Sequence, residues 1–270
     1  MSREASPLSN GRLESRLLRS AQYSVYDFDD AIFHNGAPFP YSLYPKGRVW
    51  HRSVRAASTV IAGNDYLAEF AAKISQQVVM IPSCVNPSAY PLKSSYELSE
   101  IPTLVWLGSP ATEPFLKMLT EPLLRINADT PIRLRVISSG ARSLGALEEI
   151  VDRVQWSAES FASSLADADI GLMPLPDTPF TRGKCAYKLL QYAAAGLPVV
   201  GSPVGTNKKV LDDLEGLSAP TPSGWEDAIR DLLATSARAR SEIGKAGRNA
   251  VDAGYSFEAW APFWRATVGL

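Results

Sequence analysis

Three cations, Arg182, Lys184 and Lys188, stand close together within a stretch, 178–211, that contains no acid. The chain as a whole is balanced, with 27 lysines and arginines against 28 aspartates and glutamates. The pattern predicts an apolar helix over 184–195. Because the N-terminal end of a helix already carries positive partial charge, cations there are unfavourable unless a negative group compensates their charge. The stretch therefore predicts a bound anion.

Two interpretations fit these cations. Lys184 and Lys188 are expected one turn apart on one helix face, which could simply be a solvated basic surface. The remaining helix positions, such as Leu189 and Leu190, are apolar and should be buried, and Gly183 would allow a ligand to approach the backbone. A bound diphosphate accounts for all of these features, and we favour it over the solvated surface.

A second anion site is predicted in the segment "WLGSPATEPFL", where an apolar strand runs into Gly108. Ser109 and Thr112 follow in a strand–turn–helix junction whose backbone N–H groups could bind an anion. The alternative is an ordinary N-cap at Thr112, with Glu113 interacting favourably with the helix dipole. One diphosphate explains both junctions if they lie at the same crevice.

The elements that must position these residues form a regular pattern. Short apolar runs predict strands, and they alternate with helical patterns. The predicted strands are 103–108, 132–138, 169–175 and 198–202, and the helices are 113–127, 143–150, 159–167, 184–195, 223–235 and 237–253. Such alternation is typical of a parallel sheet covered on both faces, a Rossmann-like α/β domain. In such sheets ligands bind outside the carboxyl ends of the strands.

The N-terminal part is less regular. A short helix is expected over 12–22, a strand over 23–30 that ends in acids, a loop over 35–47 and a strand over 78–85. Residues 86–100 read as a linker. At the other end, a helical face carries four aromatic side chains, which we expect to pack against a neighbouring element. These are Phe257, Trp260, Phe263 and Trp264.

Composition excludes several classes of protein. A net charge of -1 and an isoelectric point near 6.2 give no general attraction to nucleic acid. No run approaches the roughly 20 apolar residues that span a bilayer, so membrane contact is expected to be peripheral only. The polar N-terminus does not resemble a signal peptide, and two distant cysteines suit a reduced, cytoplasmic protein. Two histidines are too few to suggest a metal site.

The segment "DIGLMPLPDTPFTRGKCAYKLLQYAAAGLPVVGSPVG" resembles the donor-binding segment of retaining glycosyltransferases of the GT-B fold, family four. "VYDFDDAIF", "VIAGNDYLAEFA" and "WLGSPATEPFLKML" resemble further segments of this family, in the same order. The resemblance covers roughly residues 12 to 265. It implies two Rossmann-like domains with parallel sheets.

The resemblance also implies a domain organisation. Residues 1–100 would form the acceptor-side domain, 101–255 the donor domain, and 256–270 a helix that packs back on the N-terminal domain. About 100 residues precede the donor domain, fewer than the roughly 150 of an ordinary domain. The expectation is therefore a partial N-terminal domain, in either a fragment or a shortened protein.

The activity implied is transfer of a sugar from a nucleoside diphosphate sugar to an unknown hydroxyl acceptor, with retention and without a cofactor or metal. Relatives carry two glutamates in the donor segment, and Gly183 and Gln191 occupy the matching positions. Gln191 can still bind a ribose hydroxyl, and Asp177 is a candidate substitute for the first carboxylate. Asp29 and Asp30 end a first-domain strand, where they would orient the acceptor hydroxyl or, equally, cap the following turn.

Relatives also place an arginine and a lysine after the first strand of the donor domain, where this chain has Ser109 and Pro114. The phosphate charge would then fall on the three cations described first. Synthesis of cell-envelope polysaccharide or glycolipid, at the inner face of the membrane, is the family-level expectation.

Two other functions compete. Asp27 and Asp29 have the Asp-x-Asp spacing of haloacid dehalogenase-type phosphatases, although Ala31 replaces the usual threonine or valine and no later acidic pair completes a magnesium site. A chain with a partial acceptor domain could also bind nucleotide-sugars without transferring them, or act as a subunit.

Overall fold

The computed structural model describes residues 1–6, 9–34 and 45–270. Most of the predicted loop over 35–47 lies outside these residues. Contacts divide the chain into two compact units. Unit 1 comprises Met1–Ser83, Asp177–Cys185 and Glu258–Leu270, and unit 2 comprises Cys84–Pro176 and Ala186–Phe257.

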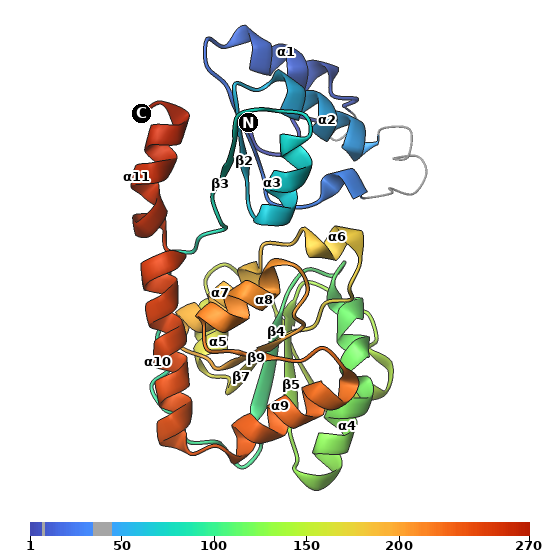
Figure 1. Cartoon of the computed structure of the whole chain (residues 1–270). Coiled ribbons are helices and arrows are strands. Elements are labelled where there is room, and N and C mark those ends of the chain that lie inside the picture. Colours follow the sequence, from blue (N-terminus) through green and yellow to red (C-terminus); the bar gives the residue numbers. More distant parts are fainter. Residues whose placement is uncertain (7–8, 35–44) are drawn as a thin grey trace. The chain divides into compact units, whose positions relative to one another are not determined.

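Unit 2 contains a sheet with the order β6-β5-β4-β7-β8-β9, in which all neighbouring strands are parallel (Figure 1). Its strands are β4 (Thr103–Leu107), β5 (Arg133–Ser138), β6 (Val151–Gln155), β7 (Ile170–Met173), β8 (Val199–Gly201) and β9 (Leu217–Ser218). The four predicted apolar strands are confirmed. The sequence did not reveal β6, which is only partly buried and mixes charged with apolar residues, or β9, which has two residues.

Helices cover both faces of this sheet, as the alternating pattern predicted. They are η4 (Glu113–Leu119), α4 (Thr120–Asp129), η5 (Gly145–Glu149), α5 (Phe161–Ala166), α7 (Tyr187–Ala194), α8 (Thr206–Asp213), α9 (Pro222–Ala234) and α10 (Ala237–Gly254), and a short 3₁₀ turn, η3 (Pro87–Ala89), lies before the sheet. Val105 and Leu107 of β4 join a core with α5, α7, α8 and α10. Leu104 and Trp106 join a second core with η4, α4 and α9 on the opposite face. The α/β fold class is therefore confirmed for this unit.

Unit 1 contains a parallel sheet with the order β1-β2-β3 among the described residues. Its elements are α1 (Arg12–Ser20), β1 (Val25–Phe28), η1 (Ile32–His34), α2 (Lys46–Ala56), β2 (Thr59–Ala62), α3 (Asp65–Ala72), β3 (Val78–Met80), α6 (Pro179–Arg182) and α11 (Phe257–Val268). Tyr26 and Phe28 of β1 pack with Trp50 of α2 and Leu67 of α3 in its core.

The C-terminal helix α11 differs from the expectation for its aromatic face. Phe257, Phe263 and Trp264 expose 55%, 47% and 44% of their surfaces, so they are not packed into a core of the described residues. Within unit 1 the helix is linked to the N-terminal segment because the Tyr23 hydroxyl donates to the carbonyl of Thr267 at 2.7 Å. Pro262 lies inside the helix.

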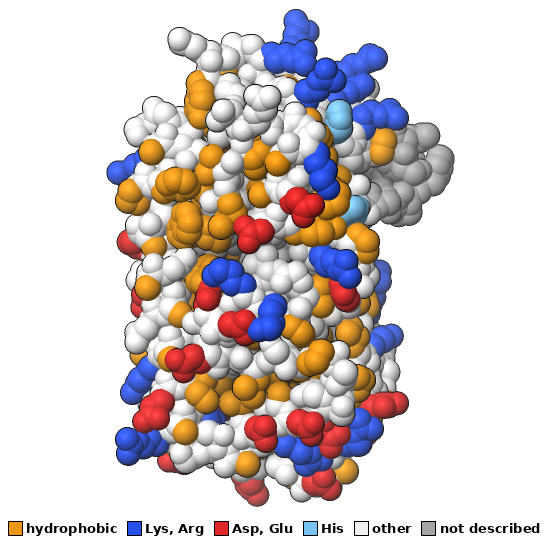
Figure 2. Space-filling view, viewed as in Figure 1, with side chains coloured by type: hydrophobic (Ala, Val, Ile, Leu, Met, Phe, Trp, Pro, Cys, Tyr) orange, Lys and Arg blue, Asp and Glu red, His pale blue; other side chains and the backbone are white. Residues whose placement is uncertain are grey.

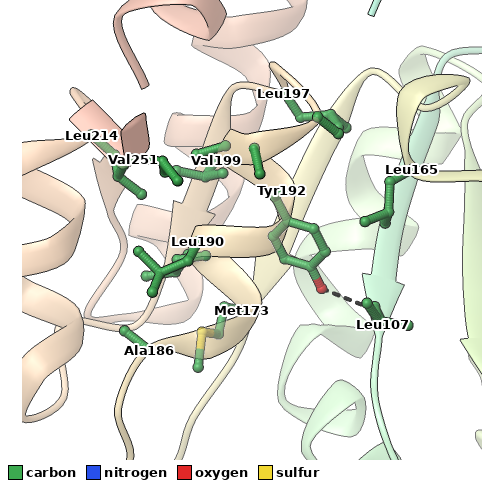
Figure 3. Close-up of a cluster of buried hydrophobic side chains, with 14 of the residues drawn as sticks. Leu107, Leu165, Met173, Ala186, Leu190, Tyr192, Leu197, Val199, Leu214 and Val251 are labelled. Carbon is green, nitrogen blue, oxygen red and sulfur yellow. Dashed lines mark hydrogen bonds between the residues drawn. The ribbon is translucent and has the colours of Figure 1, made fainter. Parts of the chain in front are cut away.

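The hydroxyl of Tyr192 connects β4 and β7 at the point where the strand order reverses. These strands pair at Leu104–Ile170 and Val105–Gly171. Beyond that pair, Leu107 N–H donates to Tyr192 Oη at 2.8 Å (Figure 3), and Tyr192 Oη donates to the carbonyl of Leu172 at 3.2 Å. The switch point of an open parallel sheet is where ligands bind. Tyr192 therefore fixes the two strand ends that border this place.

Glycine at position 171 makes room for this side chain. A Cβ atom there would lie 2.6 Å from the Tyr192 ring, which is closer than van der Waals contact allows. Tyr192 is fully buried, and burial raises the pKa of its hydroxyl, which therefore stays protonated and able to donate.

Replacing Tyr192 with phenylalanine should lower the free energy of unfolding by about 1–3 kcal/mol, because the buried N–H of Leu107 loses its acceptor. Tyr187→Phe is the matched control on the same helix. Its side chain is 46% exposed, so water can replace the hydrogen bond that its hydroxyl shares with Tyr90. The control should change stability by less than about 0.5 kcal/mol. If urea unfolding gave equal losses of unfolding free energy for the two variants, the buried hydrogen bonds of Tyr192 would contribute no more to stability than an exposed hydroxyl.

Candidate functional site

The junction after β4 has fewer available donors than the sequence suggested. Gly108 N–H donates to the carbonyl of Ile137 at 3.1 Å, and the N–H groups of Thr112 and Glu113 donate to the carbonyl of Ser109. The N–H groups of Ser109 and Ala111 make no hydrogen bond with the described part of the chain. Any anion bound by the backbone here must therefore use these two groups, together with the Ser109 and Thr112 hydroxyls.

Thr112 is not the side-chain cap that one interpretation proposed. No side-chain capping hydrogen bond forms at Thr112, and the element that follows is a 3₁₀ helix. The Thr112 hydroxyl instead donates to the carbonyl of Ser109 at 3.1 Å and lies 3.4 Å from the Ser109 hydroxyl. The two hydroxyl groups thus stand together at the carboxyl end of β4.

Glu113 points inward instead of toward the helix end. Its side chain is 1% exposed, and Arg153 Nη1 lies 3.5 Å from one of its carboxylate oxygens. Gly140, in the loop after β5, makes room for it, because a Cβ there would lie 2.0 Å from Glu113 Oε1. Glu113, which the alternative interpretation placed at the helix end, is therefore a buried carboxylate paired with Arg153.

Lys188 is brought to this same junction. Helix α7 begins at Tyr187, so Lys188 lies in its first turn, which contains no acid. Lys188 Nζ lies 5.7 Å from the centre of a Trp106 ring, and a Cβ at position 108 would lie 2.9 Å from Lys188 Cε. Gly108 therefore accommodates both the Trp106 ring and the lysine stem. The N-terminal end of α7 and the end of β4 meet, as predicted, through Lys188.

Gln191, the predicted ribose ligand, is 8% exposed and donates from Nε2 to Tyr90 Oη at 3.1 Å. Burial raises the pKa of Tyr90 to about 12, so its hydroxyl stays protonated. A ribose role for Gln191 remains a prediction.

The predicted helix over 184–195 is wrong at its start. Residues Asp177–Cys185 belong to unit 1, and α7 belongs to unit 2. Ala186, between them, has a φ of 55°, in the left-handed region, which interrupts any continuous helix. Lys184 and Lys188 therefore do not share a helix face.

Arg182 and Lys184 already have acidic partners in unit 1. Arg182 Nε and Nη2 donate to the two carboxylate oxygens of Asp177 at 2.6 and 3.0 Å, and these hydrogen bonds lower the pKa of Asp177. Lys184 Nζ lies 3.3 Å from Asp30 Oδ1. These two cations therefore have carboxylate partners within the chain, and their contact with a diphosphate remains a prediction.

Asp29 and Asp30, the predicted acceptor-side carboxylates, follow β1 and are held by Arg3. Arg3 Nη2 contacts Asp29 Oδ1 at 2.7 Å and Asp30 Oδ2 at 2.9 Å. Neither carboxylate accepts a backbone N–H from the described residues, so the turn-capping alternative is not observed. Sequence reasoning missed Arg3 because no spacing rule links it to residues 26 and 27 positions later.

The segment Asp177–Cys185 packs closely within unit 1. Asn64, which caps α3, also donates from Nδ2 to the carbonyls of Gly183 and Lys184 at 3.1 and 3.2 Å. A Cβ at position 183 would lie 2.4 Å from Ala31 Cβ. The space that the sequence reserved for a ligand at Gly183 is therefore filled by Ala31, and a glutamate could not be accommodated there.

No group of three or more His, Cys, Asp or Glu side chains able to hold a metal ion occurs in residues 1–6, 9–34 and 45–270. Within the same residues, no helix is both long and apolar enough to cross a membrane. Burial raises the pKa of Asp27, which lies partly buried in β1 between the buried residues Tyr26 and Phe28.

The family model described as "Glycosyl transferases group 1" matches residues 101–235, which is half of the 270-residue chain. The chain belongs to this family. The matched residues contain the sheet of unit 2 and both junctions at its switch point. No curated protein matches the chain.

Solved structures share the fold at low sequence identity. HepE from Anabaena, in complex with UDP and glucose, matches with a TM-score of 0.70 and 11% identity over 99% of this chain and 84% of HepE. WaaG, a glycosyltransferase involved in lipopolysaccharide biosynthesis, matches with a TM-score of 0.70 and 16% identity over 92% of this chain and 75% of WaaG. A TarM variant from S. aureus, in complex with fondaparinux, α-GlcNAc-glycerol and UDP, matches with 0.70 and 12% identity over 92% of this chain.

The chain spans 51% of that TarM chain. These matches, with the parallel sheets of both units, establish a GT-B-like fold.

Replacing Lys188 with methionine, which keeps the apolar stem, should weaken binding of UDP by about 1.5–3 kcal/mol, the scale of a charged hydrogen bond. Uridine binding should change far less, because uridine carries no phosphate. Lys208→Met is the matched control, since Lys208 is an exposed lysine of unit 2 paired with Asp212. Calorimetry that shows equal losses for UDP and uridine would remove Lys188 from the phosphate site.

Gly183→Ala should loosen the segment Asp177–Cys185 from unit 1, because the added methyl group collides with Ala31. Cys185 reports this change: its thiol donates to the carbonyl of Asp29 at 3.2 Å, and burial raises its pKa to about 12. Alkylation of Cys185 should be slow in the native protein and several-fold faster in the variant.

Gly254→Ala is the control for this experiment, because a Cβ there meets nothing within 4 Å. Peptide mapping after alkylation separates Cys185 from Cys84. Unchanged protection of Cys185 in Gly183→Ala would contradict the packing described.

Proposed function

We propose that the protein transfers a sugar from a nucleoside diphosphate sugar to a hydroxyl acceptor. The observation that carries the proposal is the position of Lys188 beside Gly108, at the switch point of a domain that matches a glycosyltransferase family. The chemical step separates a diphosphate from the sugar, and the negative charge that develops on it must be stabilised. A lysine in the first turn of a helix and two free backbone N–H groups can supply this stabilisation.

The donor would bind along the carboxyl ends of β4 and β7. Its diphosphate would contact Lys188, the hydroxyls of Ser109 and Thr112, and the N–H groups of Ser109 and Ala111 next to Gly108, and its ribose would contact Gln191. Arg182 and Lys184 are secondary candidates, because each would first have to leave Asp177 or Asp30. UDP is the probe of choice, since HepE and TarM are described in complex with UDP.

The acceptor side is proposed for unit 1. Asp29 and Asp30 stand at the carboxyl end of β1, where a carboxylate could orient a hydroxyl group. Asp30 carries less exposed surface than Asp29, with side chains 21% and 49% exposed. Both are charge-compensated by Arg3, so their role is to orient the acceptor instead of taking its proton.

The same proposal includes three further properties. These are retention at the anomeric carbon, membership of family four, and a role in envelope polysaccharide or glycolipid assembly at the cytoplasmic face.

Two alternatives give different outcomes. A protein that binds nucleotide-sugars without transferring them would have the same donor site and would show no transferase activity. The phosphatase alternative rests on Asp27 and Asp29, and the family match argues against it. Magnesium-dependent release of phosphate from an aryl phosphate, lost in Asp27→Asn, would revive it.

Binding of UDP should survive EDTA, because the proposed diphosphate contacts are lysine, hydroxyl and backbone groups. Titration calorimetry with EDTA and again with added Mg²⁺ measures this. A large loss of affinity in EDTA that Mg²⁺ restores would contradict the proposed set of contacts.

The function itself is tested in two steps. UDP-, GDP- and ADP-sugars are screened by thermal shift, and an affinity in the micromolar range or weaker, about -8 kcal/mol or less in magnitude, is expected for one of them. Products with mixed hydroxyl acceptors are then analysed by NMR, where a retained anomeric configuration is expected. No shift with any nucleotide would contradict the donor site, whereas binding without a transfer product would favour the non-catalytic alternative.

A further inference from the structure

A basic groove of about 800 Å³ lies between α1 and α2 of unit 1, on elements that the proposed reaction does not use. It is lined by Arg12, Ser15, Arg16, Arg19, Ser20, His51, Arg52 and Arg55. In Figure 2, Lys and Arg side chains gather at the end of the view where Figure 1 draws these two helices. Five guanidinium groups around one groove contrast with a net charge of -1 for the whole chain.

The acids that could neutralise this groove are turned away from it or absent. Glu14, the acid of α1, is fully buried and accepts hydrogen bonds from Ser9 Oγ and from Ala5 N–H. None of the five arginines forms an ion pair with a carboxylate of the described residues. Arg125, Arg230 and Arg238 of unit 2, by contrast, each pair with a glutamate. Charge in the groove is therefore concentrated and not compensated within this part of the chain.

Folding alone does not explain such an arrangement. Like charges that are brought together on one face repel each other, so the groove is unfavourable in the absence of a ligand. Arg52 is oriented by a hydrogen bond from Nη1 to the carbonyl of Asn10 at 2.7 Å, while the other four arginines are exposed. Guanidinium groups bind phosphate oxygens in pairs. The hydroxyls of Ser15 and Ser20 already donate to backbone carbonyls, so the arginines are the donors that the groove offers.

We infer that the α1–α2 groove is a binding site for a ligand with two or more phosphate groups, separate from the donor site in unit 2. The phosphates could belong to a soluble molecule or to lipid headgroups. Leu13 and Leu17 are relevant to this choice, because each is 47% exposed on α1 beside the arginines. A bilayer would bury these leucines, whereas a soluble ligand would leave them in water.

Tripolyphosphate is the probe for the first arm, measured by calorimetry. Arg16→Gln combined with Arg55→Gln should weaken its binding at least about tenfold, since each lost charged hydrogen bond is worth roughly a factor of ten or more. Arg125→Gln combined with Arg238→Gln removes the same charge from unit 2 and should have little effect. Tripolyphosphate that binds at the proposed donor site would instead be weakened by Lys188→Met and not by the arginine variant. This difference separates the two sites, and it separates a failure of this inference from a failure of the proposed function.

Vesicles of phosphatidylcholine with and without phosphatidylglycerol form the second arm. Binding only to the anionic vesicles, competed by tripolyphosphate and weakened by Leu13→Gln with Leu17→Gln, would assign the phosphates to lipid headgroups. Tripolyphosphate binding without vesicle binding would assign them to a soluble ligand. If the double arginine variant is poorly folded by circular dichroism, Arg19→Gln replaces it. Absence of both kinds of binding, or equal losses in the groove and control variants, would overturn the inference.

Discussion

The proposed donor site depends on one buried hydroxyl group. Tyr192 accepts the N–H of Leu107 and donates to the carbonyl of Leu172, so it holds the ends of β4 and β7 at the place where their direct pairing has stopped. Tyr192 lies on the same helix as Lys188 and Gln191, which precede it by four residues and by one residue. Fixing the helix to both strand ends therefore also fixes the lysine beside Gly108. The hydrogen bonds of Tyr192 thus account both for the packing of unit 2 at this point and for the position of Lys188, the residue proposed to bind phosphate.

A second constraint divides the donor segment between the two units. Gly183 fits against Ala31, and the amide of Asn64 holds the carbonyls of Gly183 and Lys184. Arg182 of this segment pairs with Asp177. Lys184 pairs with Asp30, which also pairs with Arg3. Acids from elsewhere in the chain therefore neutralise part of the acid-free stretch, and Lys188 lies at the switch point of unit 2.

The sequence predicted the strands of the donor domain because each is a short, continuous apolar run, and the structure places β4, β5, β7 and β8 there. It predicted the junction at Gly108 and Lys188 because strand ends and helix starts have local signals. It could not predict the pairing of Arg182 with Asp177, the burial of Glu113 beneath Gly140, or the bridge from Arg3 to Asp29. The last two are tertiary contacts between residues that carry no shared pattern, and the first joins residues five positions apart across the short helix α6. The break at Ala186 was also hidden, because alanine rarely adopts a positive φ.

The most direct test of the central claim is a crystal structure of the protein with UDP bound. The account predicts a diphosphate at the carboxyl ends of β4 and β7, with an oxygen about 3 Å from Lys188 Nζ and another within hydrogen-bonding distance of the Ser109 or Ala111 N–H. The ion pair between Arg182 and Asp177 should remain closed. A diphosphate that contacts Arg182 and Lys184 and leaves Lys188 without a phosphate contact would contradict the account.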